Sequence, residues 1–185
     1  MRRRRTGRSG LLAALVLIVL TVWTAARVYE WAGSNAREPK AVLYLLQVSA
    51  FQQQMLAGEL QEAGGLQETG QLEALKRAVY SAQYSHERLL RAADDAAAPP
   101  AMGMYRELIS CLTGLELSGR RPLTEAEKAM LTGAAEPVKA LAGAYAAMLG
   151  EDREWNRKET EDLKRRDAEL VEYLERSAFK LESAS

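Results

Sequence analysis

The sequence predicts an all-α protein: a single transmembrane helix near the N-terminus, then an up-and-down helical bundle that ends in a long charged helix. Three observations predict this class. Ala and Leu are frequent, an uncharged run follows an arginine-rich start, and the rest of the chain repeats apolar residues at spacings of three and four. The 185 residues suffice for one ordinary domain plus an anchor. We expect a cytoplasmic basic tail at 1–9, an anchor at 10–32 and an extracytoplasmic helical domain at 38–182.

The first segment carries the membrane prediction. Residues 9–26 form a stretch of 18 residues without a charge. At about 1.5 Å per residue this stretch spans roughly 27 Å, close to the roughly 30 Å of a bilayer core. Five arginines among residues 1–10 place the N-terminus inside a bacterial cell and the rest of the chain outside its cytoplasmic membrane. Representative anchor residues are Leu11, Leu15, Ile18 and, at the exit interface, Trp23.

A cleaved signal peptide is the alternative, because Thr24, Ala25 and Ala26 are small residues of the kind signal peptidase requires. The apolar run is slightly long for such a peptide, and aromatic residues follow it. We therefore favour an uncleaved anchor embedded in the lipid bilayer. Both interpretations place the remaining chain outside the cytoplasm.

The outer part of the chain is acidic. The 175 residues after position 10 carry 20 Lys and Arg against 25 Asp and Glu, which excludes nucleic acid as an expected partner. The single cysteine, Cys111, cannot form an intramolecular disulfide. Its apolar neighbours favour a buried small hydrophobe, and an intermolecular disulfide is the alternative.

Proline and glycine residues that start or end helices divide the outer part of the chain into helical segments. Pro39 starts a helix near residue 38, which runs through Val42, Leu45, Leu46, Val48, Phe51, Met55 and Leu60 to the Gly64–Gly65 pair. A third, shorter helix is expected over 101–117. The second helix carries the most regular apolar stripe: Leu72, Leu75, Val79, Ala82, His86, Leu89 and Ala93.

A capping box marks the next helix start. Thr124 and Glu127 can each satisfy an unpaired backbone N–H of the other. Gly133 and Pro137 are expected to bend this fourth helix. Its apolar stripe then resumes at Val138, Leu141, Tyr145 and Met148.

The final stretch differs in kind, since 17 of the 26 residues in 151–176 are charged. Its acid-before-base pairs at i,i+4 favour an exposed helix; they are Glu154–Lys158, Glu161–Arg165, Asp162–Arg166 and Glu172–Arg176. One interpretation is a solvated helix that leans on the bundle; the other is a helix that binds a protein partner or a second copy. In the second case, removal of residues from about 159 onward would leave the earlier helices folded. The candidate partner-binding residues are Leu163, Leu170, Leu174 and Leu181.

Residues for chemistry are sparse. The sequence holds no nucleophile motif, no phosphate-binding glycine loop and no spaced Cys/His metal set, so we predict no catalytic, cofactor-binding or metal-binding residues and no enzyme. The single histidine, His86, lies on an apolar stripe and is expected to be a satisfied core residue. Tyr80, Tyr84 and Tyr105 can line a groove, although aromatic residues at helical spacing usually pack.

Two segments, 72–86 and 121–128, resemble the N-terminal region of bacterial spore-germination proteins that accompany a cortex-lytic enzyme. Those proteins begin with a basic tail, an anchor and helices. The resemblance implies a non-enzymatic accessory role in the bacterial envelope. That family continues into C-terminal domains that this sequence lacks, and no functional residue is carried over from it.

Two functions from different classes follow. The first is a membrane-tethered interaction or scaffold protein of the bacterial envelope, associated with a protein partner or with itself. The second is an extracytoplasmic helical sensor that binds a small molecule between its helices. Because only about nine residues precede the anchor, such a sensor acts through another subunit.

Overall fold

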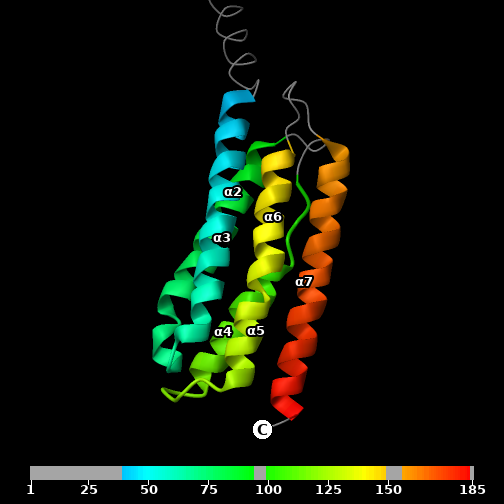
Figure 1. Ribbon diagram of the computed structural model, residues 1–185. Coiled ribbons are helices and arrows are strands. Elements are labelled where there is room, and N and C mark those ends of the chain that lie inside the picture. The colour runs from blue at the N-terminus through cyan, green and yellow to red at the C-terminus, as the bar shows by residue number, and fades with distance from the viewer. Residues whose placement is uncertain (1–38, 94–98, 149–155, 184–185) are drawn as a thin grey trace, which may run out of the picture. The chain divides into compact units, whose positions relative to one another are not determined.

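Helices account for nearly all of the chain that the computed structural model describes, which is residues 39–93, 99–148 and 156–183 (Figure 1). No β-strand is present in these ranges. The α-helices are α2 (Pro39–Glu62), α3 (Glu73–Ala92), α4 (Met104–Leu117), α5 (Glu125–Gly133), α6 (Ala135–Ala147) and α7 (Arg157–Ser183), with short 3-10 helices at Ala63–Gly65 and Thr69–Gln71.

The helices alternate in direction, which confirms the predicted up-and-down bundle. Figure 1 shows α2 descending, α3 rising, α4 descending, α5 and α6 rising one after the other, and α7 descending. α2 packs against α3 and α6, α7 packs against α6 and α4, and α4 packs against α3. The helices therefore enclose one core as a closed ring of five rods, of which α5 and α6 together form one.

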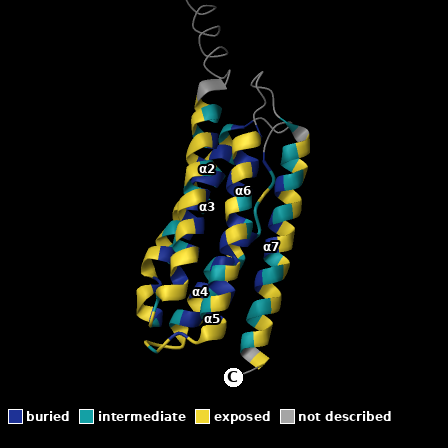
Figure 2. Cartoon of the chain, viewed as in Figure 1, coloured by how far each residue is buried: buried dark blue, intermediate teal, exposed yellow. Residues whose placement is uncertain are grey.

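The predicted core positions of two helices are confirmed. All seven stripe positions of the second helix, from Leu72 to Ala93, are buried, and so are the four from Val138 to Met148, in α6 and at its C-terminal end. The predicted capping box is also present, because Glu127 N donates to Thr124 Oγ1 at 3.2 Å and Thr124 N donates to a Glu127 carboxylate oxygen at 2.8 Å. Figure 2 shows buried and exposed positions alternating along each helix.

The predicted cytoplasmic tail at 1–9 and anchor at 10–32, with Leu11, Leu15, Ile18 and Trp23, lie outside the described residues. Within the ranges that are described, no helix combines the length and the hydropathy needed to cross a bilayer. The membrane anchor therefore stays a prediction from the sequence.

The predicted bend of the fourth helix occurs between α5 and α6. Ala134 N donates to the Leu131 carbonyl three residues back, so the Met130 carbonyl loses its usual helical donor. The hydroxyl of Tyr173, on α7, replaces that donor at 3.1 Å. This contact needs a residue without a side chain at position 133, where a Cβ atom would lie 2.9 Å from Tyr173 Cζ and closer still to its hydroxyl.

Gly133→Ala is therefore expected to lower the free energy of unfolding by about 1–3 kcal/mol, because Tyr173 must give up its position against the bend. Urea unfolding measures the change. Gly143→Ala is the matched control: nothing lies within 4 Å of the added Cβ, and a helix-interior Ala is favoured over Gly by about 0.5–1 kcal/mol. An equal effect of the two substitutions would contradict this account of position 133.

Candidate functional site

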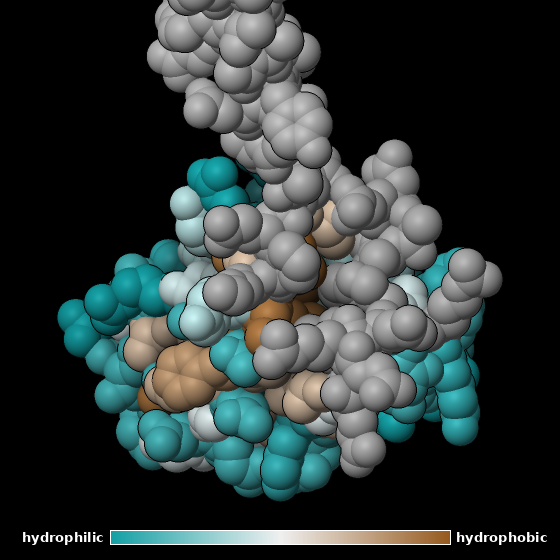
Figure 3. All heavy atoms as spheres, turned by 90° about the horizontal axis from the view of Figure 1, so that it is seen from above, coloured by the Kyte–Doolittle hydropathy of each residue, from teal (hydrophilic) through white to brown (hydrophobic). Residues whose placement is uncertain are grey.

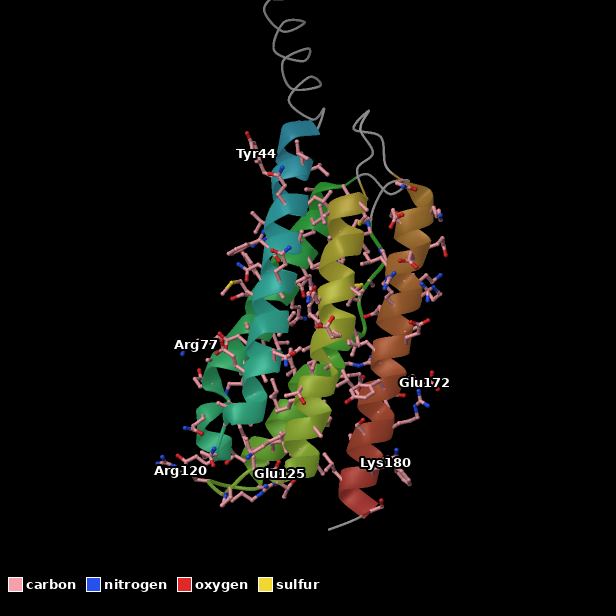
Figure 4. The ribbon with its side chains drawn as sticks, in the orientation of Figure 1. Tyr44, Arg77, Arg120, Glu125, Glu172 and Lys180 are labelled. Carbon is pink, nitrogen blue, oxygen red and sulfur yellow. The ribbon has the colours of Figure 1, made fainter. Side chains whose placement is uncertain are left out.

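Three of the four leucines predicted to bind a partner face the bundle's own core. Leu163, Leu170 and Leu174 are completely buried in the bundle's own core, so their side chains are unavailable to a partner in this structure. Leu181 is half-buried and lines a shallow groove between α5 and α7 with Met130. The face of α7 that reaches solvent is charged, and Figure 4 shows Glu172 and Lys180 pointing away from the bundle.

Charge pairs stabilise this outer face of α7 as predicted, with one difference. Two of the predicted i,i+4 pairs are present, Asp162 with Arg166 and Glu172 with Arg176. Arg165 pairs with Asp162 and with Glu169.

A buried polar layer crosses the core of the bundle. One polar residue from each rod contributes to it, although most of the other core positions are apolar. Its members are Gln53 on α2, His86 on α3, Tyr105 on α4, Tyr145 on α6 and Asp167 on α7. We call these five residues the polar layer.

Hydrogen bonds connect four of the five members. The Gln53 side-chain amide donates to the Tyr105 hydroxyl, and the Tyr145 hydroxyl bonds to His86 Nδ1. The Tyr105 and Tyr145 hydroxyls interact with one another, and the His86 ring lies against both tyrosine rings with centroids 5.7 and 5.9 Å apart. The layer thereby ties α2, α3, α4 and α6 together inside the core.

Asp167 fixes the start of α4. Its two carboxylate oxygens accept the backbone N–H groups of Gly103 and Met104 at 2.8 and 2.9 Å. Such N–H groups have no partner within their own helix, and a carboxylate at a helix N-terminus also meets the positive end of the helix dipole. A Cβ at position 103 would lie 3.2 Å from Val171, so glycine there allows α7 to come close.

Burial shifts the titration of these groups away from their ordinary ranges. Desolvation lowers the pKa of His86 to about 4, although the nearby Pro100 carbonyl opposes this shift. Desolvation raises the pKa of Tyr105 and of Tyr145. Desolvation also raises the pKa of Asp167, against the two backbone N–H groups that favour its charged form. His86 and both tyrosines are therefore neutral at pH 7.

Three polar atoms, two of them in the polar layer itself and one beside it, have no hydrogen-bond partner among the described residues. They are the Ser49 hydroxyl, Gln53 Oε1 and His86 Nε2. Ser49 lies one turn before Gln53 on the buried side of α2. Buried polar atoms are nearly always satisfied in proteins, often by an enclosed water molecule, so this part of the core has capacity for further hydrogen bonds.

Asp167→Asn tests the link between α7 and α4. An amide offers only one oxygen and turns its NH2 group toward a backbone donor, so we expect a loss of about 1–3 kcal/mol in the free energy of unfolding. Asp162→Asn, five residues earlier on the same helix, disrupts ion pairs near the surface and should change stability much less. Chemical denaturation compares the two variants, and similar losses would contradict the special role of Asp167.

The outer side of α2 is the second unusual feature. No Asp, Glu, Lys or Arg occurs from residue 41 to residue 58. Charged residues make up 27% of the whole chain, so a stretch of this length would be expected to contain about five of them. Figure 4 shows Tyr44 pointing away from the bundle. The exposed residues of this stretch, which we call the uncharged face, are Ala41, Tyr44, Gln47, Val48, Phe51, Gln54, Met55 and Gly58.

Large apolar side chains form a stripe along the uncharged face. Tyr44, Val48, Phe51 and Met55 are 64%, 46%, 55% and 47% exposed. Their spacing of four, three and four residues is the spacing of a coiled-coil seam. The first predicted helix thus divides its apolar residues between two sides, with Leu46 and Leu60 buried in the core and this stripe facing solvent.

A groove beside the stripe continues the apolar surface onto α3. It has a volume of about 580 Å³, and Val48 and Gln52 of α2 line it together with Tyr80, Tyr84 and Glu87 of α3. Tyr80 and Tyr84 are exposed, and the Arg88 guanidinium lies 4.8 Å above the Tyr84 ring. Viewed from the end at which α2 begins, apolar side chains reach the surface among hydrophilic ones (Figure 3).

No group of three or more His, Cys, Asp or Glu side chains suited to a metal ion is present in the described part of the chain. Cys111 is partly buried and unpaired within that part, and burial raises the pKa of its thiol.

No protein-family model matches the sequence, and comparisons with curated proteins and with solved structures give no match. The resemblance of segments 72–86 and 121–128 to spore-germination accessory proteins accordingly stays a prediction. The fold and its two unusual features, the polar layer and the uncharged face, are the basis for proposing a function.

Proposed function

We propose that this protein is a membrane-anchored, non-enzymatic interaction protein of the bacterial envelope, and that it binds its partner through the uncharged face and the adjoining groove. The observation that carries the proposal is the exposed stripe Tyr44, Val48, Phe51 and Met55. A role as a sporulation or germination accessory is part of this proposal and rests on the sequence resemblance alone.

The size of the exposed surface supports binding. Four aromatic side chains on this surface, Tyr44, Phe51, Tyr80 and Tyr84, are each about half exposed. Since a fully buried aromatic residue covers 150–250 Å², they leave on the order of 400 Å² of aromatic surface open. Apolar patches of that size on a monomer are often functional. Aromatic residues also dominate the energetics of protein interfaces.

Photocrosslinking in native membranes tests this proposal. A photoreactive phenylalanine derivative at Phe51 should give a covalent adduct with a protein, whereas the same group at Ala168, which is exposed on α7, should give little. Absence of an adduct at Phe51 would contradict the proposed binding surface.

The proposed orientation in the membrane has its own test. Protease added outside protoplasts should digest the chain beyond about residue 31 while the N-terminal tail stays protected. Protection of the helical domain until the membrane is broken would overturn the outward orientation.

A sensor for a small polar molecule is the second candidate function. The observation that favours it is the set of three unpartnered polar atoms on Ser49, Gln53 and His86. We rank it second because enclosed water molecules can satisfy the same atoms. Thermal-shift measurements with amino acids, dicarboxylates and sugars test it; a stabilisation that Gln53→Leu abolishes would favour a sensor.

A further inference from the structure

We infer that the partner of the uncharged face is a second copy of this chain, so that two anchored copies pair in parallel along α2. This inference rests on the proposed function and specifies the partner. It follows from the chemistry of the face, its spacing and its position in the chain.

The chemistry of the face suits contact with itself. In a two-fold symmetric dimer, a surface patch meets the same patch of the other copy, and charged residues near the axis then meet like charges. The exposed residues of α2 from Ala41 to Gly58 are all uncharged, so no such repulsion arises along the stripe. The charges beside it, Glu87 and Arg88, lie on α3. A different partner is usually selected and oriented by complementary charges, which this face lacks.

The spacing of the stripe suits a paired helix. Side chains at intervals of four, three and four residues recur on one side of a helix, and each can insert between side chains of a second helix with the same spacing. Tyr44, Val48, Phe51 and Met55 cover three turns in this way. A second α2 is a helix that presents the matching pattern.

The position of α2 suits a parallel pair. α2 begins at Pro39, only seven residues after the predicted anchor ends at position 32. Two copies anchored in the same direction in one bilayer are related by a two-fold axis along the membrane normal, as a parallel pair requires. Confinement to a membrane also raises the effective concentration of the two faces, so an interface smaller than the roughly 800 Å² per partner of a soluble complex is sufficient.

Cysteine crosslinking of the full chain in membranes is the first test. In a Cys111→Ser background, Val48→Cys places identical cysteines near the two-fold axis, within the 4.4–6.8 Å Cα separation that a disulfide needs. We expect a disulfide-linked dimer to form at least tenfold faster than with Ala168→Cys, the exposed control position on α7. Equal rates at positions 48 and 168 would overturn the inference.

A charge exchange at the stripe is the second test, and it needs two copies that touch at the same residue. Phe51→Lys added to Val48→Cys should reduce the homodimer about tenfold because like charges meet. Coexpression of the Phe51→Lys and Phe51→Glu chains should restore crosslinking between them. Phe51 is exposed, so circular dichroism should show that both variants keep the fold. Failure of the mixed pair to recover would count against direct contact of the two faces.

The outcomes separate this inference from the function on which it rests. A photocrosslinked adduct of Phe51 with twice the mass of the chain supports both. An adduct only with a different protein keeps the proposed interaction function and overturns self-association. No adduct and no disulfide dimer overturns both.

Discussion

Removal of residues 157–185 is expected to unfold the helical domain. α7 buries Leu163, Leu170 and Leu174 in the common core, and deletion of one such leucine side chain costs about 2–5 kcal/mol. The same deletion removes Asp167 from the start of α4 and the Tyr173 hydroxyl from the bend between α5 and α6. Because domains of this size are stable by only about 5–15 kcal/mol, the combined loss exceeds what the remaining helices can tolerate.

Far-UV circular dichroism and urea unfolding of fragments 38–185 and 38–156 measure this effect. Fragment 38–185 should unfold cooperatively, and fragment 38–156 should show no cooperative transition. A synthetic peptide of residues 157–183, added to the shorter fragment, should restore part of the transition because it supplies the missing core leucines. The double variant Glu172→Ala and Arg176→Ala changes only the outer face of α7 and is the control. A fully cooperative unfolding transition of fragment 38–156 would show that the other helices fold without α7. It would then favour the solvated or partner-binding helix that the charge of this segment predicts.

α7 shows what the pattern of charged and apolar residues in a sequence can and cannot establish. Its high charge and thin leucine seam correctly predict a long helix with an exposed charged face. They do not establish what covers the seam, because leucines spaced by seven, four and seven residues fit a groove on the same chain as well as a groove on a partner. The other four rods leave one position open between α4 and α6, and α7 fills it.

Helices with a strong contrast between their faces were predictable to the residue. In α3 every apolar stripe position is buried, because polar residues occupy the other faces and only one orientation hides the apolar side. The capping box at Thr124 and Glu127 is similarly local, since it depends on residues three apart.

The orientation of α2 could not be predicted from apolar residues alone. Its buried side includes Ser49 and Gln53, whereas Val48, Phe51 and Met55 face solvent. Polar residues enter the core there because Gln53 bonds to Tyr105, which lies 52 residues later in the chain. A pairing of that kind depends on the assembled bundle and leaves no periodic signal in either segment.

The polar layer was missed for the same reason. Each member has an ordinary local interpretation, and His86 and Tyr145 were correctly placed on buried stripes. What the sequence does not show is that the side chains of five separate rods reach one level of the core. The one available hint was His86 on an otherwise apolar stripe, since a buried imidazole requires polar neighbours.

Acidification from pH 6.5 to pH 4 is expected to lower the free energy of unfolding through His86 by about 3 kcal/mol. The pKa of His86 is about 4 in the folded bundle and near 6.5 in an unfolded chain. Above pH 6.5 the imidazole is neutral in both states and has no effect. Between the two values only the unfolded chain takes up the proton, so acid favours unfolding; below about pH 4 both states are protonated and the loss is complete. Only 2% of His86 is exposed, so solvent does little to screen this effect.

Urea unfolding at several pH values between 7 and 4 tests this expectation, with His86→Asn as the reference. Asn removes the titration and keeps a polar atom near the place of Nδ1, opposite the Tyr145 hydroxyl. The difference between the two proteins isolates His86 from Asp167, whose raised pKa acts with the opposite sign, and from Glu127, whose pKa is lowered chiefly by Arg121. The chain contains one histidine, so an NMR titration of tag-free protein reports its pKa directly. A titration near pH 6.5, together with parallel stability curves for the two proteins, would show that the imidazole is hydrated and that the polar layer is open to water.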